Sequence, residues 1–159
     1  MMNRRNAMIA ALVAASGVPA MAAPADKAVV EAFYASFLTA SGQDVAAQGE
    51  RIMAANFESV GDYSGKTKSR AELIEQIRGF HKLVPDLKWS PQDIIEAGSR
   101  FVVRARASGA PKGPMFGVDG KGKSFTLMSI DIHEVSDGKI VRVYHVEDWA
   151  GALAQLAAR

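Results

Sequence analysis

Four side chains that could carry acid–base chemistry fall within one short stretch, residues 125–149. They are Asp131, His133, His145 and Asp148, so the stretch holds two of the three histidines in the chain. Histidine titrates near neutral pH, and a carboxylate beside the ring can orient it. Asp131 and His145 could therefore form a general acid–base pair. Alternatively, Asp131 and His145 could be a hydrogen-bonded polar pair on a solvated sheet face without a catalytic role.

Two other kinds of chemistry have weaker support in the sequence. Asp131, His133 and His145 would also supply a metal site of two histidines and one carboxylate. We rank a metal-dependent enzyme below the acid–base interpretation, because three ligand-type residues often meet on one hairpin by chance. The chain has no Gly-x-Ser-x-Gly motif, which argues against a hydrolase triad. We therefore expect a site without a metal; that it also works without another cofactor is what the family resemblance given below implies.

These residues lie on a predicted β-hairpin. Two runs rich in Ile, Val, Phe and Tyr flank Asp137-Gly138, and such a pair of runs split by Asp-Gly is the strongest short-range hairpin signal. The hairpin brings residues from both of its arms within reach of one another, provided that they point to the same face of the sheet.

The loop of the hairpin decides which face each residue takes. A two-residue loop pairs Ser136 with Lys139 and would point Asp131 and His145 to opposite faces. A three-residue loop pairs Val135 with Lys139 and would place both side chains on one face. We predict the three-residue loop, because it also gathers further polar side chains on that face: Ser129 and His133.

The rest of the chain predicts helices followed by strands. Ser69 and Glu72 form a capping box at the start of one helix, and strict alternation marks Phe101–Ala107 as a strand. The order predicts an α+β domain, a curved antiparallel sheet with helices packed on one face. Helices are expected over residues 26–40, 44–55, 70–84 and 150–158, and strands over 57–63, 87–97, 100–108 and the two arms of the hairpin.

Length, charge and cysteine content limit the function classes. The 159 residues suit one domain with its own core. Omitting Arg4 and Arg5, which belong to a predicted leader that holds no acidic residue, reduces the 19 basic residues to 17, equal to the 17 acidic residues. This balance gives no support for a nucleic-acid partner. The absence of cysteine excludes disulfides and a thiol nucleophile.

Residues 1–22 are predicted to be a secretory signal peptide. Arg4-Arg5 form a basic region, residues 7–18 form an apolar segment too short to span a bilayer, and Ala20-Met21-Ala22 fits the cleavage rule. Export would use the Sec pathway or, given the paired arginines, the twin-arginine pathway. We expect residues 23–159 to form a single domain that is periplasmic or secreted and has no membrane partner after cleavage.

Short motifs in a specific order carry a resemblance to a known family. They are PDLKW (85–89), GSRFVVR (98–104), SG (108–109), GPMFG (113–117), DGKIV (137–141), Asp148 and QL (155–156). On these motifs the mature chain resembles the SnoaL-like polyketide cyclase (ester cyclase) family, which belongs to the nuclear-transport-factor-2-like superfamily. The resemblance implies a cone-shaped pocket, enclosed by a strongly curved sheet and closed by helices.

The resemblance also implies a type of chemistry. In polyketide cyclases of this family, an aspartate on the last strand and a histidine on the preceding strand drive a cofactor-free aldol closure. The place of the aspartate falls on His145 and that of the histidine on Asp131, so the two residue types are exchanged. We expect a small apolar ligand, His145 as the base and Asp131 orienting it. The candidate pocket residues are Tyr34, His81, Trp89, Ser129, His133 and Asp148.

Two further expectations concern the pocket and the assembly. A non-catalytic periplasmic carrier could use the same pocket for a small ligand, and this is the alternative to cyclisation or isomerisation chemistry. On the hairpin, a second set of side chains alternates with the polar set and would form an apolar outer face, which predicts a homodimer. This set consists of Met128, Ile130, Ile132, Tyr144 and Val146.

Overall fold

A six-stranded sheet is the frame of the molecule, with the strand order β2-β1-β6-β5-β4-β3. The computed structural model describes residues 24–158, so the predicted signal peptide lies outside the described residues. The strands are β1 (Met53–Val60), β2 (Lys68–Ser69), β3 (Lys88–Ala97), β4 (Arg100–Gly109), β5 (Phe125–Ser136) and β6 (Lys139–Glu147). The helices are α1 (Pro24–Ala32), the π-helix η1 (Phe33–Leu38), α2 (Val45–Ile52), α3 (Arg70–Leu83) and α4 (Trp149–Ala157).

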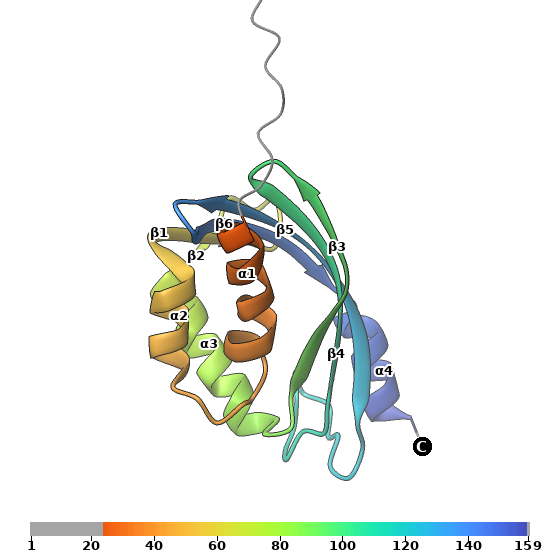
Figure 1. Cartoon of the computed structure of the whole chain (residues 1–159). Helices are drawn as coiled ribbons and strands as arrows, with labels where there is room; N and C mark the ends of the chain where they lie inside the picture. Colours follow the sequence, from red (N-terminus) through yellow and green to blue (C-terminus); the bar gives the residue numbers. More distant parts are fainter. Residues whose placement is uncertain (1–23, 159) are drawn as a thin grey trace, which may run out of the picture.

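The sheet is strongly curved, and α1, α2 and α3 lie in its hollow (Figure 1). Helix α4 covers the same inner face at the far end, where Ala152 and Leu156 pack with Phe125 and Leu127 of β5. The α+β class with helices on one face of a curved sheet is therefore confirmed. The sheet is not purely antiparallel, because β1 pairs with β6 in parallel.

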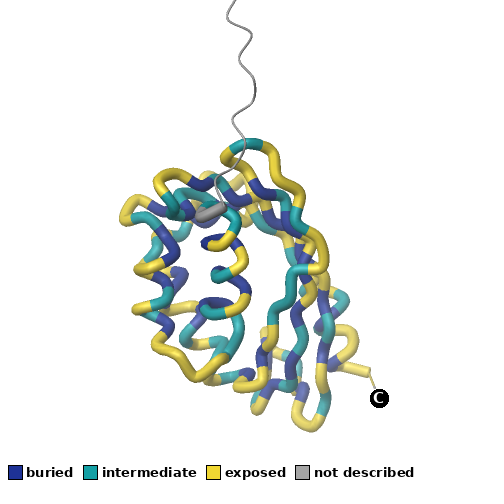
Figure 2. The backbone as a smooth tube through the Cα atoms, viewed as in Figure 1, coloured by how far each residue is buried: buried dark blue, intermediate teal, exposed yellow. Residues whose placement is uncertain are grey.

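Alternation along the strands separates the two faces of the sheet. Along β5 every second residue from Phe125 to Val135 is buried, whereas Met128, Ile130 and Ile132 between them are exposed. Figure 2 shows this alternation of buried and exposed positions along the strands. Helix α3 begins with the predicted capping box, in which Ser69 and Glu72 each bond the other's backbone N–H. Binary patterning and capping therefore fix the layers as the sequence predicts.

The loop of the β5–β6 hairpin differs from the prediction. Ser136 pairs with Lys139, so the loop has two residues, Asp137 and Gly138, and the prediction of a three-residue loop is wrong. Both loop residues have positive φ, 52° and 69°, as a type I′ turn requires. The twist of a type I′ turn matches the twist of the flanking strands, which explains why Asp137-Gly138 adopts this turn.

Asp131 and His145 nevertheless share a face, for a different reason. The register shifts between the pair Val135–Ile140 and the pair Glu134–Arg142, which leaves one extra residue on β6. This bulge moves every later residue of β6 by one position. Asp131 therefore lies directly opposite His145 rather than diagonal to it.

Candidate functional site

A cavity that is partly open to solvent lies between the inner face of the sheet and the helices η1 and α3. Most of its wall is apolar, with Phe33 and Leu38 from η1 and Ile77 from α3. The apolar lining suits a small and largely apolar molecule. The polar groups of the wall are Ser59, Gln76, Asp131, His145 and Glu147.

Asp131 is held by a buried network behind the cavity wall. The Tyr34 hydroxyl donates to Asp131 Oδ2 at 2.7 Å, and the Ser129 hydroxyl donates to the same oxygen at 2.8 Å. His133 Nε2 lies 2.8 Å from the Tyr34 oxygen. Because the single hydroxyl proton of Tyr34 goes to Asp131, His133 donates through Nε2, and its Nδ1 has no partner among the described residues.

This network leaves one carboxylate oxygen free. Asp131 Oδ1 accepts no hydrogen bond from a described residue, although Asp131 lines the cavity. Burial raises the pKa of Asp131 to about 6, and the hydrogen bonds from Tyr34 and Ser129 oppose that rise. Burial lowers the pKa of His133 to about 3, so this ring is neutral at any physiological pH. The pKa of Tyr34 is raised by burial and by Asp131, so Tyr34 remains a donor.

A second polar chain crosses the wall from β1 to β6. Ser59 Oγ lies 3.0 Å from His145 Nε2, and His145 Nδ1 lies 2.8 Å from Glu147 Oε1. The hydrogen bond with Glu147 is the main cause that raises the pKa of His145, while partial burial opposes it. His145 therefore holds a proton more tightly than a free histidine.

Aromatic rings close one side of the cavity. Phe80 of α3 and Trp149 of α4 both line it and are stacked, with centroids 5.6 Å apart and an interplanar angle of 4°. Phe116, in the loop between β4 and β5, packs edge-on against both rings and is 60% exposed. These rings add a flat apolar surface to the ligand space.

The fold agrees with comparisons against known proteins. The model of the family described as SnoaL-like polyketide cyclase matches residues 28–156. The chain belongs to this family. No curated protein matches the chain at a significant level.

Several solved structures share the fold. IdmH of Streptomyces antibioticus, a candidate polyketide cyclase, is 23% identical with a TM-score of 0.72, covering 84% of this chain and 99% of its own. A candidate SnoaL-like polyketide cyclase from Jannaschia sp. CCS1 is 18% identical with a TM-score of 0.75, covering 92% and 99%. AclR of Streptomyces galilaeus, a candidate hydroxylase, is 19% identical with a TM-score of 0.69, covering 84% and 96%. At these identities the likeness shows the fold alone.

The SnoaL-like site brings Asp131 and His145 together on the cavity wall, but not as the predicted pair. Asp131 bonds to Tyr34 and Ser129, whereas the ring of His145 is oriented by Glu147. The expectation that Asp131 orients His145 is therefore corrected. Glu147 lies two residues after His145 on β6, on the same inward face, and it orients the ring instead.

Four of the other predicted pocket residues lie in or behind the site. Trp89 lines the cavity, and its indole N–H is buried without a partner among the described residues. Tyr34 and Ser129 hold Asp131, as described above. His133 is fully buried behind Tyr34 and does not reach the cavity wall.

Two predicted pocket residues lie elsewhere. His81 donates through Nε2 to the carbonyl oxygen of Leu38 at 3.0 Å, and it ties the end of α3 to η1. Asp148 is exposed and caps α4 by accepting from the N–H of Gly151. Neither residue lines the cavity, so both are corrected to structural roles.

Sequence patterns missed three polar residues of the wall. Glu147 follows His145 at the i+2 spacing of one strand face, and this signal could have found it. Ser59 reaches the site because β1 pairs with β6 in parallel, and no local sequence pattern predicts that pairing. Gln76 is an exposed residue of α3, and the sequence does not distinguish it from other solvent-exposed polar residues of the helix.

The described residues show neither a metal cluster nor a membrane-spanning helix. No group of three or more His, Cys, Asp or Glu side chains in the described part of the chain is arranged to hold a metal ion. Within the same residues, each helix is too short or too polar to cross a bilayer.

Proposed function

We propose that this SnoaL-like protein binds a small, largely apolar carbonyl compound and catalyses a proton transfer on it without a cofactor. The reaction is an isomerisation or a cyclisation of the ligand. One observation carries the proposal: Asp131 presents an unbonded carboxylate oxygen to an apolar cavity while its other oxygen is fixed by Tyr34 and Ser129.

Asp131 is the general base in this proposal. A base works best when its pKa lies near the operating pH, and the pKa of Asp131 is raised to about 6. The carboxylate takes a proton from the carbon beside the ligand's carbonyl group. The fixed position of Oδ2 keeps Oδ1 in place for that step.

His145 is the general acid, rather than the base that the sequence suggested. The carboxylate of Glu147 holds a proton on the ring by raising its pKa. A protonated imidazole on the same wall can donate to the carbonyl oxygen as negative charge develops there. Asp131 then gives its proton to another carbon of the ligand, and the former carbonyl oxygen returns its proton to His145, so the enzyme ends in its starting state.

Hydrogen–deuterium exchange tests this function before any substrate is known. Ketones with apolar bodies are incubated with the protein in D₂O, and loss of the C–H signals beside the carbonyl is followed by NMR. We expect exchange with the wild type. A ligand that binds tightly without any exchange in a broad panel would contradict catalysis and favour the carrier.

Export is proposed from the N-terminal sequence. If residues 1–22 direct secretion, the protein expressed in a bacterial host is recovered from the periplasm or the medium and begins at Ala23. Edman sequencing or intact mass measurement checks this, with a variant carrying Lys in place of Arg4 and Arg5 to test the twin-arginine route. Full-length protein retained in the cytoplasm would contradict the proposal.

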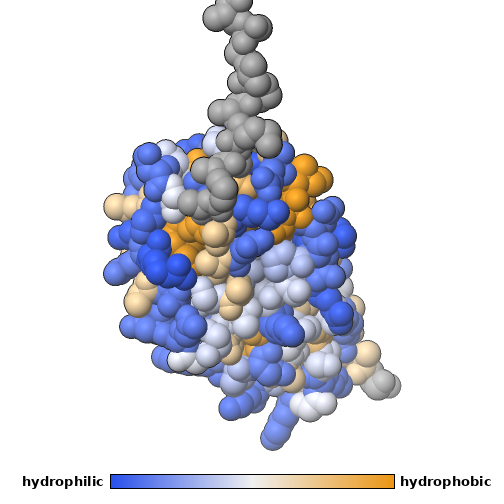
Figure 3. All heavy atoms as spheres, in the orientation of Figure 1, coloured by the Kyte–Doolittle hydropathy of each residue, from blue (hydrophilic) through white to orange (hydrophobic). Residues whose placement is uncertain are grey.

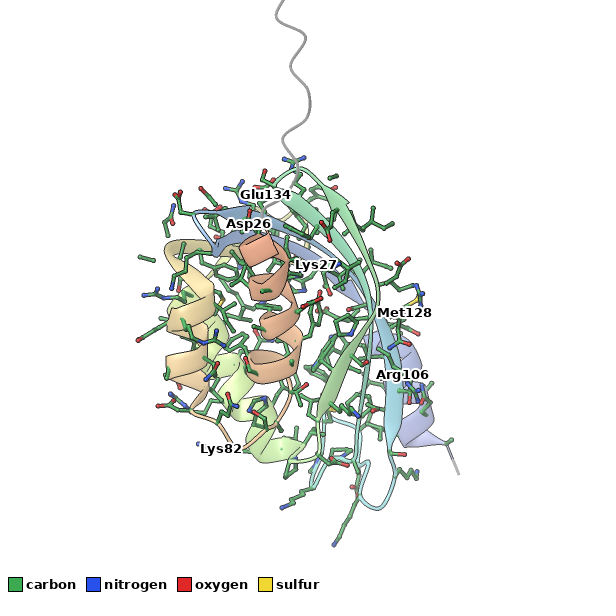
Figure 4. The ribbon with its side chains drawn as sticks, in the orientation of Figure 1. Asp26, Lys27, Lys82, Arg106, Met128 and Glu134 are labelled. Atoms are coloured by element: carbon green, nitrogen blue, oxygen red, sulfur yellow. The ribbon has the colours of Figure 1, made fainter. Side chains whose placement is uncertain are left out.

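A homodimer is proposed from the outer face of the sheet. Figure 4 shows Met128 and Arg106 on the side of the sheet away from α1, α2 and α3. On the side of the molecule that Figure 3 shows, one group of hydrophobic residues lies near the upper end of β3 and another over the helices, among mainly hydrophilic residues. On this face the large exposed apolar residues are Ile95, Met128, Ile130, Ile132, Tyr144 and Val146, from 37% to 63% exposed.

The charges around this face fit a two-fold contact. Glu134 accepts from Arg100 at 2.6 Å and from Arg142 at 3.4 Å, and these ion pairs border the apolar residues at one end. Such a patch with a polar rim is typical of an interface. The ion pairs of Glu134 are made within the chain, whereas Arg104 and Arg106, opposite Ile130 and Met128 on the same face, have no ion pair with a described residue and would need acceptors on the second copy.

Substituting the centre of the face tests the dimer. Ile130→Glu should convert a species of twice the monomer mass into monomer at micromolar concentration, because a charged carboxylate at the centre of the contact would lose its hydration. Analytical ultracentrifugation measures the mass. Tyr63→Glu, on an exposed loop residue, is the matched control and should remain dimeric. A wild-type monomer would contradict the proposal.

A further inference from the structure

The second polar chain of the cavity has the connectivity of a nucleophilic triad. A hydroxyl, an imidazole and a carboxylate follow one another, with Ser59 Oγ at 3.0 Å from Nε2 of His145 and Glu147 Oε1 at 2.8 Å from Nδ1. In serine hydrolases the same atoms are joined in the same order. This arrangement is recognised by geometry and roles, so the missing Gly-x-Ser-x-Gly motif does not decide against it.

The placement of the three residues supports this connectivity. His145 and Glu147 lie two residues apart on β6, and both line the cavity. Ser59 lies on the neighbouring strand β1, where it pairs with Val143 of β6, two residues before His145. Ser59 is 1% exposed and lines the cavity, and its hydroxyl has no partner among the described residues other than His145. The hydroxyl therefore has an adjacent base and borders the ligand space.

We propose that Ser59 is a nucleophile, activated by His145 and Glu147, that accepts the acyl group of activated esters of small apolar acids. This activity goes beyond the proton transfer assigned to Asp131. The apolar wall of the cavity sets the chemical class of the acyl group, because charged acids would be desolvated there.

The step balances in atoms and protons. The Ser59 oxygen forms a bond to the carbonyl carbon, and its proton moves to Nε2 of His145. The adduct then breaks its bond to the ester oxygen, which leaves as the alcohol with that proton. Water attacks the acyl-serine by the same transfers, releasing the acid and restoring the Ser59 hydroxyl.

Two side chains that line the cavity carry N–H groups without a hydrogen-bond partner among the described residues. The side-chain amide of Gln76 forms no hydrogen bond with a described residue, and the indole N–H of Trp89 is buried without a partner among the described residues. Donors of this kind stabilise the negative charge that develops on an ester oxygen.

The reaction requires a neutral His145, so its rate should rise with pH. The charged groups that act on His145 are Glu147 beside it, Asp131 on β5 and Lys68 on β2, and of these Glu147 and Asp131 raise its pKa. Acylation should therefore increase through a pKa above the ordinary 6.5 of histidine. The proton transfer by Asp131 requires a protonated His145 and should decline over the same range.

Covalent labelling tests the nucleophile directly. The full-length protein is incubated at pH 8.5 with an alkyl fluorophosphonate or with p-nitrophenyl butyrate, and the product is located by peptide mass spectrometry. We expect one label per chain on Ser59, with an initial burst of p-nitrophenolate. Ser59→Ala should lose the label, and Ser90→Ala, on a strand residue outside the cavity, should keep it.

Two further variants separate activation from simple accessibility. His145→Gln and Glu147→Gln should each slow labelling by about 10²-fold or more, because a serine without its base is a weak nucleophile. Using both keeps the test valid if one variant does not fold, as judged by circular dichroism. Labelling at another residue, no labelling, or labelling of Ser59 at an unchanged rate in both variants would overturn the proposal.

Discussion

Asp131→Asn should lower the rate of ligand proton exchange by about 10²–10⁴-fold, the range of general acid–base contributions. Asparagine keeps the shape and can still accept from Tyr34 and Ser129, so the cavity and ligand binding should persist. The exchange rate is measured by NMR in D₂O and the binding by calorimetry. An unchanged rate would remove Asp131 from the mechanism.

The same variant should change how stability depends on pH. The pKa of Asp131 is about 6 in the folded protein against the ordinary 3.8, so the folded state binds this proton more tightly. The contribution of Asp131 to the free energy of unfolding is therefore complete below pH 3.8 and is lost as the pH rises to about 6. A pKa difference of about two units corresponds to about 3 kcal/mol in the free energy of unfolding. The wild type should lose this amount as the pH rises, and the asparagine variant should not. Asp93→Asn, at an exposed carboxyl on β3, is the control and should behave like the wild type.

Tyr34→Phe should destabilise the folded protein. It removes the hydroxyl between Asp131 and His133 and leaves Nε2 of a fully buried imidazole without a partner. An unsatisfied buried donor costs about 1–3 kcal/mol. Urea denaturation at pH 7 measures the loss, with Tyr63→Phe on the exposed loop as a control that should lose nothing measurable.

Tyr34→Phe should also shift the pH profile. The hydrogen bond from Tyr34 lowers the pKa of Asp131, so its removal should raise that pKa further above 6. The acidic limb of the exchange rate should move to higher pH accordingly. If the stability falls but the acidic limb does not move, Tyr34 acts only in packing and another group titrates in the mechanism.

The sequence predicted the frame of the fold because local signals encode it. Strict alternation separated Ile130 and Ile132 from Asp131, and the Ser69–Glu72 capping box marked the start of α3. The loop of the hairpin was predicted wrongly because the bulge in β6 has no sequence signature of its own. One extra residue reverses the face of a whole strand, so the correct result for Asp131 and His145 came from an incorrect loop.

The site was predicted only in part because its contacts are non-local. The two histidines and Asp131 were found by residue type, whereas Ser59 lies 86 residues before His145 in the chain. Asp148 was misassigned because its position before Trp149 also suits a helix N-cap, which is the role it has. His81 was misassigned because helical periodicity shows which face is inward, but not what packs against it.

The central claim, that Asp131 is a base tuned to near-neutral pH, is tested most directly by measuring its pKa. Carboxyl carbons of the ¹³C-labelled protein are titrated by NMR from pH 3 to 9, and the Asp131 resonance is assigned by its absence in Asp131→Asn. The account predicts one aspartate with a pKa near 6, well separated from the other carboxyls. An Asp131 that titrates near the ordinary value of 3.8 would contradict it.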